Sequence, residues 1–325
     1  MNDSGDVDAA KHDGGGDAMP VLLADVGGTN TRVAVARGGT LASMRRYENA
    51  QFTSLYDLLS AHLKGADVGA IDACSVAMAG PVRGGEGRLT NRDWQISCSG
   101  LQAALGCDRV VLQNDLTALG YALGTLGGDS LHRLGVAQQG QSNGQALVIG
   151  IGTGFNLCPV GRGAQGRVQC LEVEMGHAAL PAPVRDMLGQ CLGPHAAAFT
   201  TLEALFSGGG LAHFHLARMG RAATAQQVVE AHAAGDAAAG ETLEIYTALL
   251  GAFCRELSFQ YMPLEGMYFA GSVARGILRP EFHKNLRART VAGDKLGDLL
   301  AGIPKWTILD DAAALRGCLA AITPS

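Results

Sequence analysis

The sequence predicts an α/β protein, organised either as two domains or as one large α/β domain. A chain of 325 residues exceeds the size at which a single hydrophobic core tends to split. Its first half alternates apolar strands with glycine-rich turns, whereas long alanine- and leucine-rich stretches follow residue 185. The composition is 47% hydrophobic and 17% charged, with 46 glycines, which is typical of a globular protein with many tight turns.

The folded part of the chain is predicted to begin near residue 20. Residues 1–19 are polar, acidic and glycine-rich, and they cannot bury enough apolar surface to fold, so we expect a disordered tail. Residues 21–39 contain an apolar strand, a Gly-Gly-Thr-Asn turn and a second strand of alternating polarity. This pattern predicts a β-hairpin.

The later elements continue the alternation of strands and helices. A second hairpin, at residues 144–163, resembles the first in its strand, its Gly/Thr/Asn turn and its returning strand, which indicates either chance or a duplicated core. The other expected elements are a buried strand within 69–82, a strand, turn and helix over 108–124, helices over 222–234 and 240–261, a strand running into a glycine-marked turn over 266–276, and a short helix over 310–322.

Charge and cysteine content exclude several classes of function. The net charge of −5 and the pI near 6 argue against nucleic acid or an acidic membrane surface as a partner. The eight cysteines form no Cys-x-x-Cys pair, so a zinc ribbon or a thioredoxin-type site is disfavoured. The sequence shows no signal peptide and no run of 18 apolar residues, and we therefore expect a cytoplasmic protein.

Two glycine-rich turns are candidates for phosphate binding. Gly27-Gly28-Thr29 and Gly152-Thr153-Gly154 would let backbone amides surround an anion, although each could equally be an ordinary hairpin turn. Neither matches a Walker loop or a dinucleotide-binding helix. Asp25 ends an apolar strand beside the first turn, where a carboxylate is costly unless it serves a cation or a hydrogen-bond network.

Two further groups of polar residues admit both structural and functional interpretations. Asn114-Asp115 follows a strand and precedes a helix, so the pair could cap that helix or supply a general base at the carboxyl end of a sheet strand. Glu172, Glu174 and His177 lie within six positions, a grouping that a metal site, an acid/base pair or a sugar pocket would each use.

Segments along about 250 residues resemble, in order, those of the bacterial ATP-dependent glucokinases, within the actin/hexokinase/chaperone-ATPase superfamily. They are ADVGGTNTR (24–32), AGPVRGGEGRLTNRDW (79–94), LQNDLTALGYAL (112–123), GIGTG (150–154), EMGH (174–177), TLEALFSGGGL (201–211) and FAGSVAR (269–275). The resemblance implies a two-lobed actin-like ATPase (ribonuclease H-like) fold with a central cleft. It implies a small lobe of residues 20–125 plus 312–325 and a large lobe of 126–311.

The resemblance also implies a role for each matching residue. Asp115 would be the catalytic base, and Asp25 would hold Mg²⁺ directly or through water. The substrate-binding residues would be Thr90, Asn91, Asn114, Asp115, Glu174, His177 and Glu203. The ATP-binding residues would be Ala24, Asp25, Val26, Gly27, Gly28, Thr29, Gly152, Thr153, Gly154, Gly271 and Ser272.

The resemblance resolves the interpretation of the Glu172–His177 segment. A helical di-iron site needs two Glu-x-x-His pairs, and this pair is the only one, in a segment that we expect to be strand-like. A zinc site lacks further ligands. We therefore expect Glu174 and His177 to hydrogen-bond sugar hydroxyls and Glu172 to be an ordinary exposed carboxylate.

Three positions depart from the family pattern around the ligands. The usual Gly-Thr-Gly-Leu-Gly ends here in Phe155-Asn156, Glu-Gly-Gly-His becomes Glu174-Met175-Gly176-His177, and Gly-Gly-Ile becomes Gly271-Ser272-Val273. We expect Met175 in particular to bear on sugar specificity.

The leading functional hypothesis is ATP- and Mg²⁺-dependent phosphorylation of glucose at its 6-hydroxyl by a homodimer. The alternatives are a kinase for another hexose or an amino or anhydro sugar, and a non-catalytic sugar or nucleotide sensor. Intact Asp115 and both turns argue against the sensor. Glu174, His177 and Glu203 argue against a chaperone-type ATPase.

Overall fold

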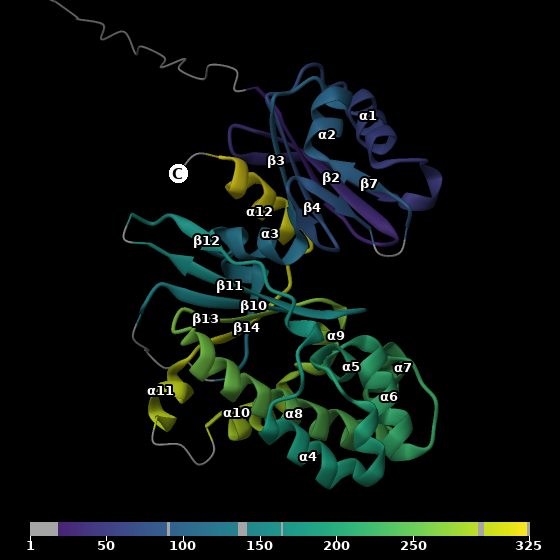
Figure 1. Ribbon diagram of the computed structural model, residues 1–325, viewed down its shortest axis with the longest axis vertical. Coiled ribbons are helices and arrows are strands. Elements are labelled where there is room, and N and C mark those ends of the chain that lie inside the picture. Colours follow the sequence, from purple (N-terminus) through teal and green to yellow (C-terminus); the bar gives the residue numbers. More distant parts are fainter. Residues whose placement is uncertain (1–18, 90–91, 136–141, 164, 292–295, 324–325) are drawn as a thin grey trace, which may run out of the picture.

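The computed structural model describes residues 19–323 apart from 90–91, 136–141, 164 and 292–295. Of the predicted disordered tail, only Met19 lies within this described part. Two mixed β-sheets, one in each half of the chain, contain the two expected hairpins, and the pair of helices α3 (Asp115–Ala122) and α12 (Ala313–Ile322) lies between them (Figure 1). Within the described part, no helix is both long and apolar enough to cross a membrane.

The sheet of the N-terminal half has the order β3-β2-β1-β4-β8. β1 (Val21–Val26) pairs antiparallel with β2 (Asn30–Arg37) and parallel with β4 (Ala73–Met78), which in turn pairs parallel with β8 (Arg109–Asn114). All six residues of β4 are buried, as expected for a central strand covered on both faces. The edge strand β3 (Thr40–Glu48) is largely exposed.

The sheet of the C-terminal half has the order β12-β11-β10-β13-β14-β9. β10 (Gln145–Ile151) pairs antiparallel with β11 (Phe155–Arg162) and parallel with β13 (Gly266–Ala270), which pairs parallel with β14 (Lys305–Ile308). The edge strands are β12 (Val168–Cys170) and β9 (Leu131–Arg133). Each sheet therefore contains an antiparallel hairpin followed by two parallel strands, and this shared topology supports the duplicated core over chance.

Helices cover the sheet faces that turn away from α3 and α12 (Figure 1). On the N-terminal half these are α1 (Leu55–Gly65) and α2 (Cys98–Leu105), beside a small sheet of β5 (Val82–Arg83), β6 (Glu86–Arg88) and β7 (Gln95–Ser97). On the C-terminal half they are α4 (Ala182–Leu192), α5 (Leu202–Phe206), α6 (Gly208–Met219), α7 (Ala225–Ala233), α8 (Ala237–Tyr261), α9 (Ser272–Ile277), α10 (His283–Val291) and α11 (Gly297–Gly302).

Most predicted elements are present, with shifts at their ends. The helix expected over 222–234 begins at Ala225, because Thr224 caps it through a capping box with Gln227. The chain after β13 was expected to be only a turn, but it forms the short helix α9 directly after Gly271. Glycine markers alone do not separate a turn from a helix start.

The contact between α3 and α12 depends on a glycine. A Cβ atom at Gly317 of α12 would lie 1.7 Å from the backbone oxygen of Ala118 in α3, so no larger residue fits without moving a helix. Gly189, in α4, has open space where its Cβ would lie.

We expect Gly317→Ala to destabilise the protein and Gly189→Ala to stabilise it. Alanine at a free helical position adds up to about 1 kcal/mol, whereas overpacking of a tight contact costs roughly 1–3 kcal/mol or more. Thermal unfolding followed by circular dichroism measures both. Equal shifts of the melting temperature in the two variants would contradict the tight contact.

Candidate active site

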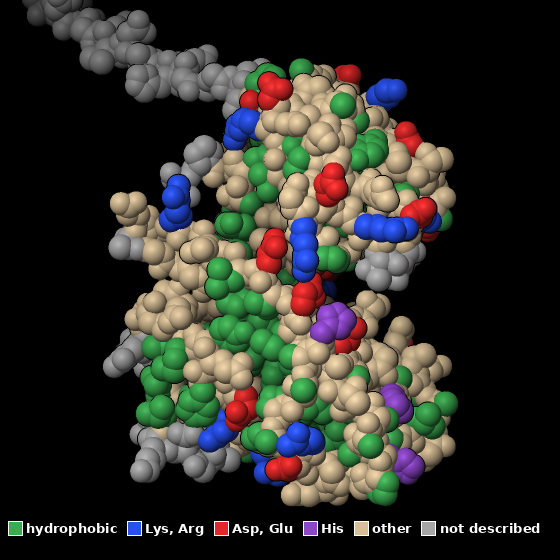
Figure 2. All heavy atoms as spheres, in the orientation of Figure 1, with side chains coloured by type: hydrophobic (Ala, Val, Ile, Leu, Met, Phe, Trp, Pro, Cys, Tyr) green, Lys and Arg blue, Asp and Glu red, His purple; other side chains and the backbone are tan. Residues whose placement is uncertain are grey.

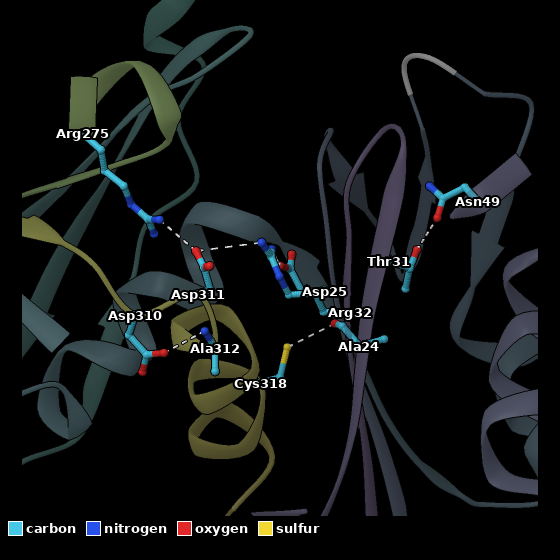
Figure 3. A network of polar contacts seen from close by, with 10 residues as sticks. All are labelled: Ala24, Asp25, Thr31, Arg32, Asn49, Arg275, Asp310, Asp311, Ala312 and Cys318. Carbon is cyan, nitrogen blue, oxygen red and sulfur yellow. Dashed lines mark hydrogen bonds and ion pairs between the residues drawn. The ribbon is translucent and has the colours of Figure 1, made fainter. Parts of the chain in front are cut away.

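The first glycine turn is held by hydrogen bonds from a neighbouring segment. The Gly27 amide donates to the Asn30 backbone oxygen at 3.0 Å, closing the turn between β1 and β2. The Asn49 side chain donates to the Gly27 oxygen at 2.8 Å and accepts from the Thr31 hydroxyl at 2.7 Å (Figure 3). The turn is therefore fixed before any ligand binds, with Gly28 and Thr29 at its tip.

Asp25 lies on β1 directly opposite Arg32 on β2, and the two side chains form an ion pair with Nη1 3.2 Å from Oδ2. Burial raises the pKa of the Asp25 carboxyl, and the charge of Arg32 opposes that rise. Arg32 also approaches Asp311, with Nη2 3.9 Å from Oδ1, and Asp311 pairs at 2.8 Å with Arg275 of α9 (Figure 3). A chain of charges thus joins the first turn to the other half of the molecule.

The second glycine turn connects β10 to β11 and lies against the start of α9. The Gly152 amide donates to the Gly154 oxygen at 3.0 Å, and the Gly208 amide donates to the Gly152 oxygen at 2.8 Å. Gly271 has φ +101°, and a Cβ there would lie 2.3 Å from the Ile151 oxygen. The Gly271-Ser272 segment can therefore approach the Gly152–Gly154 turn only because residue 271 is glycine.

Asn114 and Asp115 have features of both interpretations, a helix cap and a general base. Asn114 caps α3, because its Oδ1 accepts from the Leu116 amide at 2.9 Å, and its Nδ2 donates to the Gly80 oxygen at 3.0 Å. Asp115 is the first helical residue, and its Oδ1 also accepts from the Leu116 amide. Burial, with the nearby charge of Asp25, raises the pKa of the Asp115 carboxyl to about 7. A carboxyl with that pKa can exchange a proton at neutral pH.

Three of the residues expected to bind sugar, Glu174, His177 and Glu203, gather around the start of β11. Glu174 and His177 flank a 3₁₀ turn over Met175–His177, rather than the strand that we expected, and both are exposed. The Glu203 Oε2 accepts from the Phe155 amide at 2.9 Å. A Cβ at Gly176 would lie 2.3 Å from the Phe155 oxygen, so glycine at 176 lets the 3₁₀ turn pack onto β11.

Two connected cavities lie between the halves of the molecule. The larger, about 960 Å³, is lined by Glu174 and His177 on one side and by Tyr56, Arg83 and other residues of the N-terminal half on the other. The smaller, about 320 Å³, is lined by Asn114, Asn156 and Glu174, and also by Glu172, which we had expected to be an ordinary surface residue. Figure 2 shows charged and histidine side chains gathered where the halves meet.

Some site residues lie outside the described part or escaped prediction. Thr90 and Asn91 are not among the described residues. Asn156 was noted only as a departure from the family loop, yet it contacts Glu174. The sequence analysis assigned no role to Arg32 or Asp311. The one available signal concerned Arg32, a charged residue that alternates with apolar residues on β2, opposite Asp25.

Comparison with known proteins identifies the family to which this chain is similar. The glucokinase family profile matches residues 22–324. A glucokinase of Stenotrophomonas maltophilia is 32% identical over 322 residues, covering 93% of this chain and 95% of that protein. A bifunctional protein glk of Burkholderia pseudomallei is 33% identical over 311 residues, covering 92% of this chain and 48% of that protein, so this chain spans about half its length.

The fold is also found among solved structures. The crystal structure of a glucokinase from an Antarctic psychrotroph has a TM-score of 0.79 and 25% sequence identity, covering 93% of this chain and 98% of that one. This similarity confirms the two-lobed actin-like fold. Because the family profile spans almost the whole described chain, we conclude that the chain belongs to the glucokinase family.

Proposed function

We propose that this chain transfers the γ-phosphoryl group of ATP to the 6-hydroxyl of glucose, with Asp115 as the general base. The observation that supports this best is the Asp115 carboxyl, whose pKa is raised to about 7 at the start of α3. Asn114, the preceding residue, lines the same cavity as Glu174. A proton acceptor therefore directly follows, in the chain, a residue that lines a polar cavity suited to a sugar.

The proposed reaction balances without another reactant. Asp115 accepts the proton of the sugar hydroxyl while O6 attacks the γ-phosphorus. The bond from that phosphorus to the β–γ bridging oxygen breaks, and ADP leaves with the bonding pair. Backbone amides of the 27–29 and 152–154 turns would stabilise the charge on the transferred group, which is the main catalytic task in phosphoryl transfer.

Asp25 would hold Mg²⁺, directly or through water, when ATP is bound. Its carboxylate already faces a cation, because Arg32 lies 3.2 Å away, and a carboxylate oxygen is the donor type that Mg²⁺ prefers. The described residues contain no group of three or more His, Cys, Asp or Glu side chains that could hold a metal. Phosphate oxygens would therefore complete the coordination, and the ion would neutralise charge on the phosphates.

Sugar recognition would come from hydrogen bonds to hydroxyl groups. We assign these to Asn114, Glu174, His177 and Glu203, with Thr90 and Asn91 closing over the sugar from the N-terminal half. Ala24–Thr29 would hold phosphates of ATP, and Gly271-Ser272 would lie by the adenosine. We further propose that the lobes comprise 20–125 plus 312–325 and 126–311, and that the protein works as a cytoplasmic homodimer.

A kinase for another hexose is the second candidate. Asn156 and Met175 differ from the family pattern, and Asn156 hydrogen-bonds both Glu174 and the Met175 amide, so the preferred sugar could differ from glucose. A coupled assay for ADP formation with ATP and Mg²⁺ should separate the two. We expect the highest kcat/KM with glucose among glucose, mannose, fructose, glucosamine and an anhydro sugar. Turnover confined to another sugar supports the second candidate, and no turnover with any sugar contradicts both.

Asp115→Asn should lower kcat by at least about a hundredfold, the lower end of the usual contribution of a general base. The amide has nearly the same shape but accepts no proton. Asp108→Asn, an exposed position just before the other end of β8, is the matched control and should keep normal kcat. Sugar binding measured by calorimetry should persist in Asp115→Asn. Near-normal turnover in that variant would remove Asp115 from the base role.

The raised pKa of Asp115 predicts opposite effects of pH on stability and activity. Between about pH 4 and pH 7 the folded protein holds a proton that the unfolded chain has lost, so stability falls as the pH rises through this window. The melting temperature of Asp115→Asn, relative to wild type, should therefore increase from pH 5 to pH 7 and then level off. The wild-type kcat/KM should rise over the same range. A constant melting-temperature difference would contradict the raised pKa.

A further inference from the structure

Asn156 makes hydrogen bonds on both sides of Glu174. Its Nδ2 donates to the backbone oxygen of Val173 at 2.8 Å and to Oε2 of Glu174 at 3.2 Å. Its Oδ1 accepts from the backbone amide of Met175 at 2.9 Å and from the Leu157 amide at 2.9 Å. One side chain therefore fixes both the backbone that carries Glu174 and the Glu174 carboxylate itself.

We propose that Asn156 is a positioning residue that orients the Glu174 carboxylate for the sugar and thereby sets the selectivity of the pocket. The proposal rests on the proposed function, because it takes Glu174 to be a sugar ligand. Asn156 also lines the 320 Å³ cavity beside Glu174 and Asn114, so it lies close enough to be affected by what the cavity holds.

Glu174 needs such a partner because its surroundings restrain it little. The residue is exposed, and its backbone, at φ −118° and ψ 60°, lies outside the regular helix and strand regions. Among the residues that the structure describes, Asn156 is the one whose hydrogen bond reaches the Glu174 carboxylate. An unrestrained glutamate loses rotamer freedom when it is ordered, and a partner that orders it beforehand removes that entropic cost from sugar binding.

Two of the departures from the family pattern, Asn156 and Met175, meet at this point. The Met175 amide donates to the Asn156 side chain, while the Met175 side chain packs on the core of the C-terminal half. Met175 was expected to bear on sugar specificity, and its hydrogen bond to Asn156 is made by its backbone amide. The residue that reaches toward the cavity is Asn156.

Asn156→Gly, which restores the family residue, tests the proposal. We expect the Kd and the KM for the preferred sugar to rise about tenfold, with the KM for ATP changed less than twofold. Discrimination against a deoxy analogue that lacks the hydroxyl bound by Glu174 should shrink. Asn143→Gly is the matched control, because that side chain also bonds backbone groups, at Met262 and Gln145, but away from the cavities. It should leave the sugar Kd unchanged.

A second variant separates positioning from folding. Asn156→Asp keeps the acceptor for the Met175 and Leu157 amides but replaces the donor to Glu174 and Val173 by a second carboxylate, so it should fold and still lose sugar affinity. In a Glu174→Gln background, Asn156→Gly should change the sugar Kd less than twofold, because its effect passes through the Glu174 carboxylate.

Each remaining outcome has a defined meaning. Wild-type sugar affinity in both Asn156 variants would overturn the inference and leave the proposed function standing. A full tenfold loss in the Glu174→Gln background would also overturn it, because Asn156 would then act without Glu174. Failure of the wild-type protein to bind any sugar would overturn the proposed function, and the inference with it.

Discussion

The partial burial of two acidic side chains, Asp25 and Asp115, where the halves of the molecule meet is the constraint on which the rest of the site depends. Asp25 and Asp115 repel each other, which contributes to the raised pKa of Asp115, and a buried carboxylate is stable only with a partner. Asp25 has Arg32, and Arg32 also approaches Asp311, which pairs with Arg275 from the other half. Asp25, to which we assign Mg²⁺, therefore belongs to a charge network that reaches both halves of the molecule.

The position of Asp115 depends on close packing as well as on charge. Asp115 begins α3, and α3 is fixed on two sides by contacts that only glycine permits. Gly317 brings α12 against Ala118, and a Cβ at Gly120 would lie 2.6 Å from Sγ of Cys170 on β12. Because protein interiors do not adjust freely to added volume, these contacts hold the helix start, and with it the carboxylate, at a fixed place relative to both glycine turns.

Much of this arrangement could be predicted from the sequence, because it depends on local patterns. The two hairpins, the strand before Asp115 and the long helices have the expected periodicity, and the ordered motifs identify the family and the fold. The short strands β9, β12 and β14 were missed, since three or four residues show too little alternation to detect. Asp311 and Asn156 could not be assigned roles because their partners, Arg275 and Glu174, lie 36 and 18 residues away, and only tertiary structure brings them together. Arg32 lies seven residues from Asp25, but its pairing depends on the register of the hairpin.

The residues after the second glycine turn join the two halves of the proposed chemistry. The Phe155 amide binds the Glu203 carboxylate, and the Asn156 side chain binds that of Glu174, directly after the turn that would hold phosphates. A shift of this turn on nucleotide binding would therefore move the Phe155 amide and the Asn156 side chain. These are the donors to Glu203 and Glu174, the carboxylates that we assign to sugar binding. If nucleotide binding changes the affinity for sugar in this way, thermodynamic linkage requires that sugar binding change the affinity for nucleotide by the same factor. Glycine in place of Asn156 would leave only the backbone contact to Glu203, so this side chain adds a second connection between the nucleotide turn and the sugar pocket.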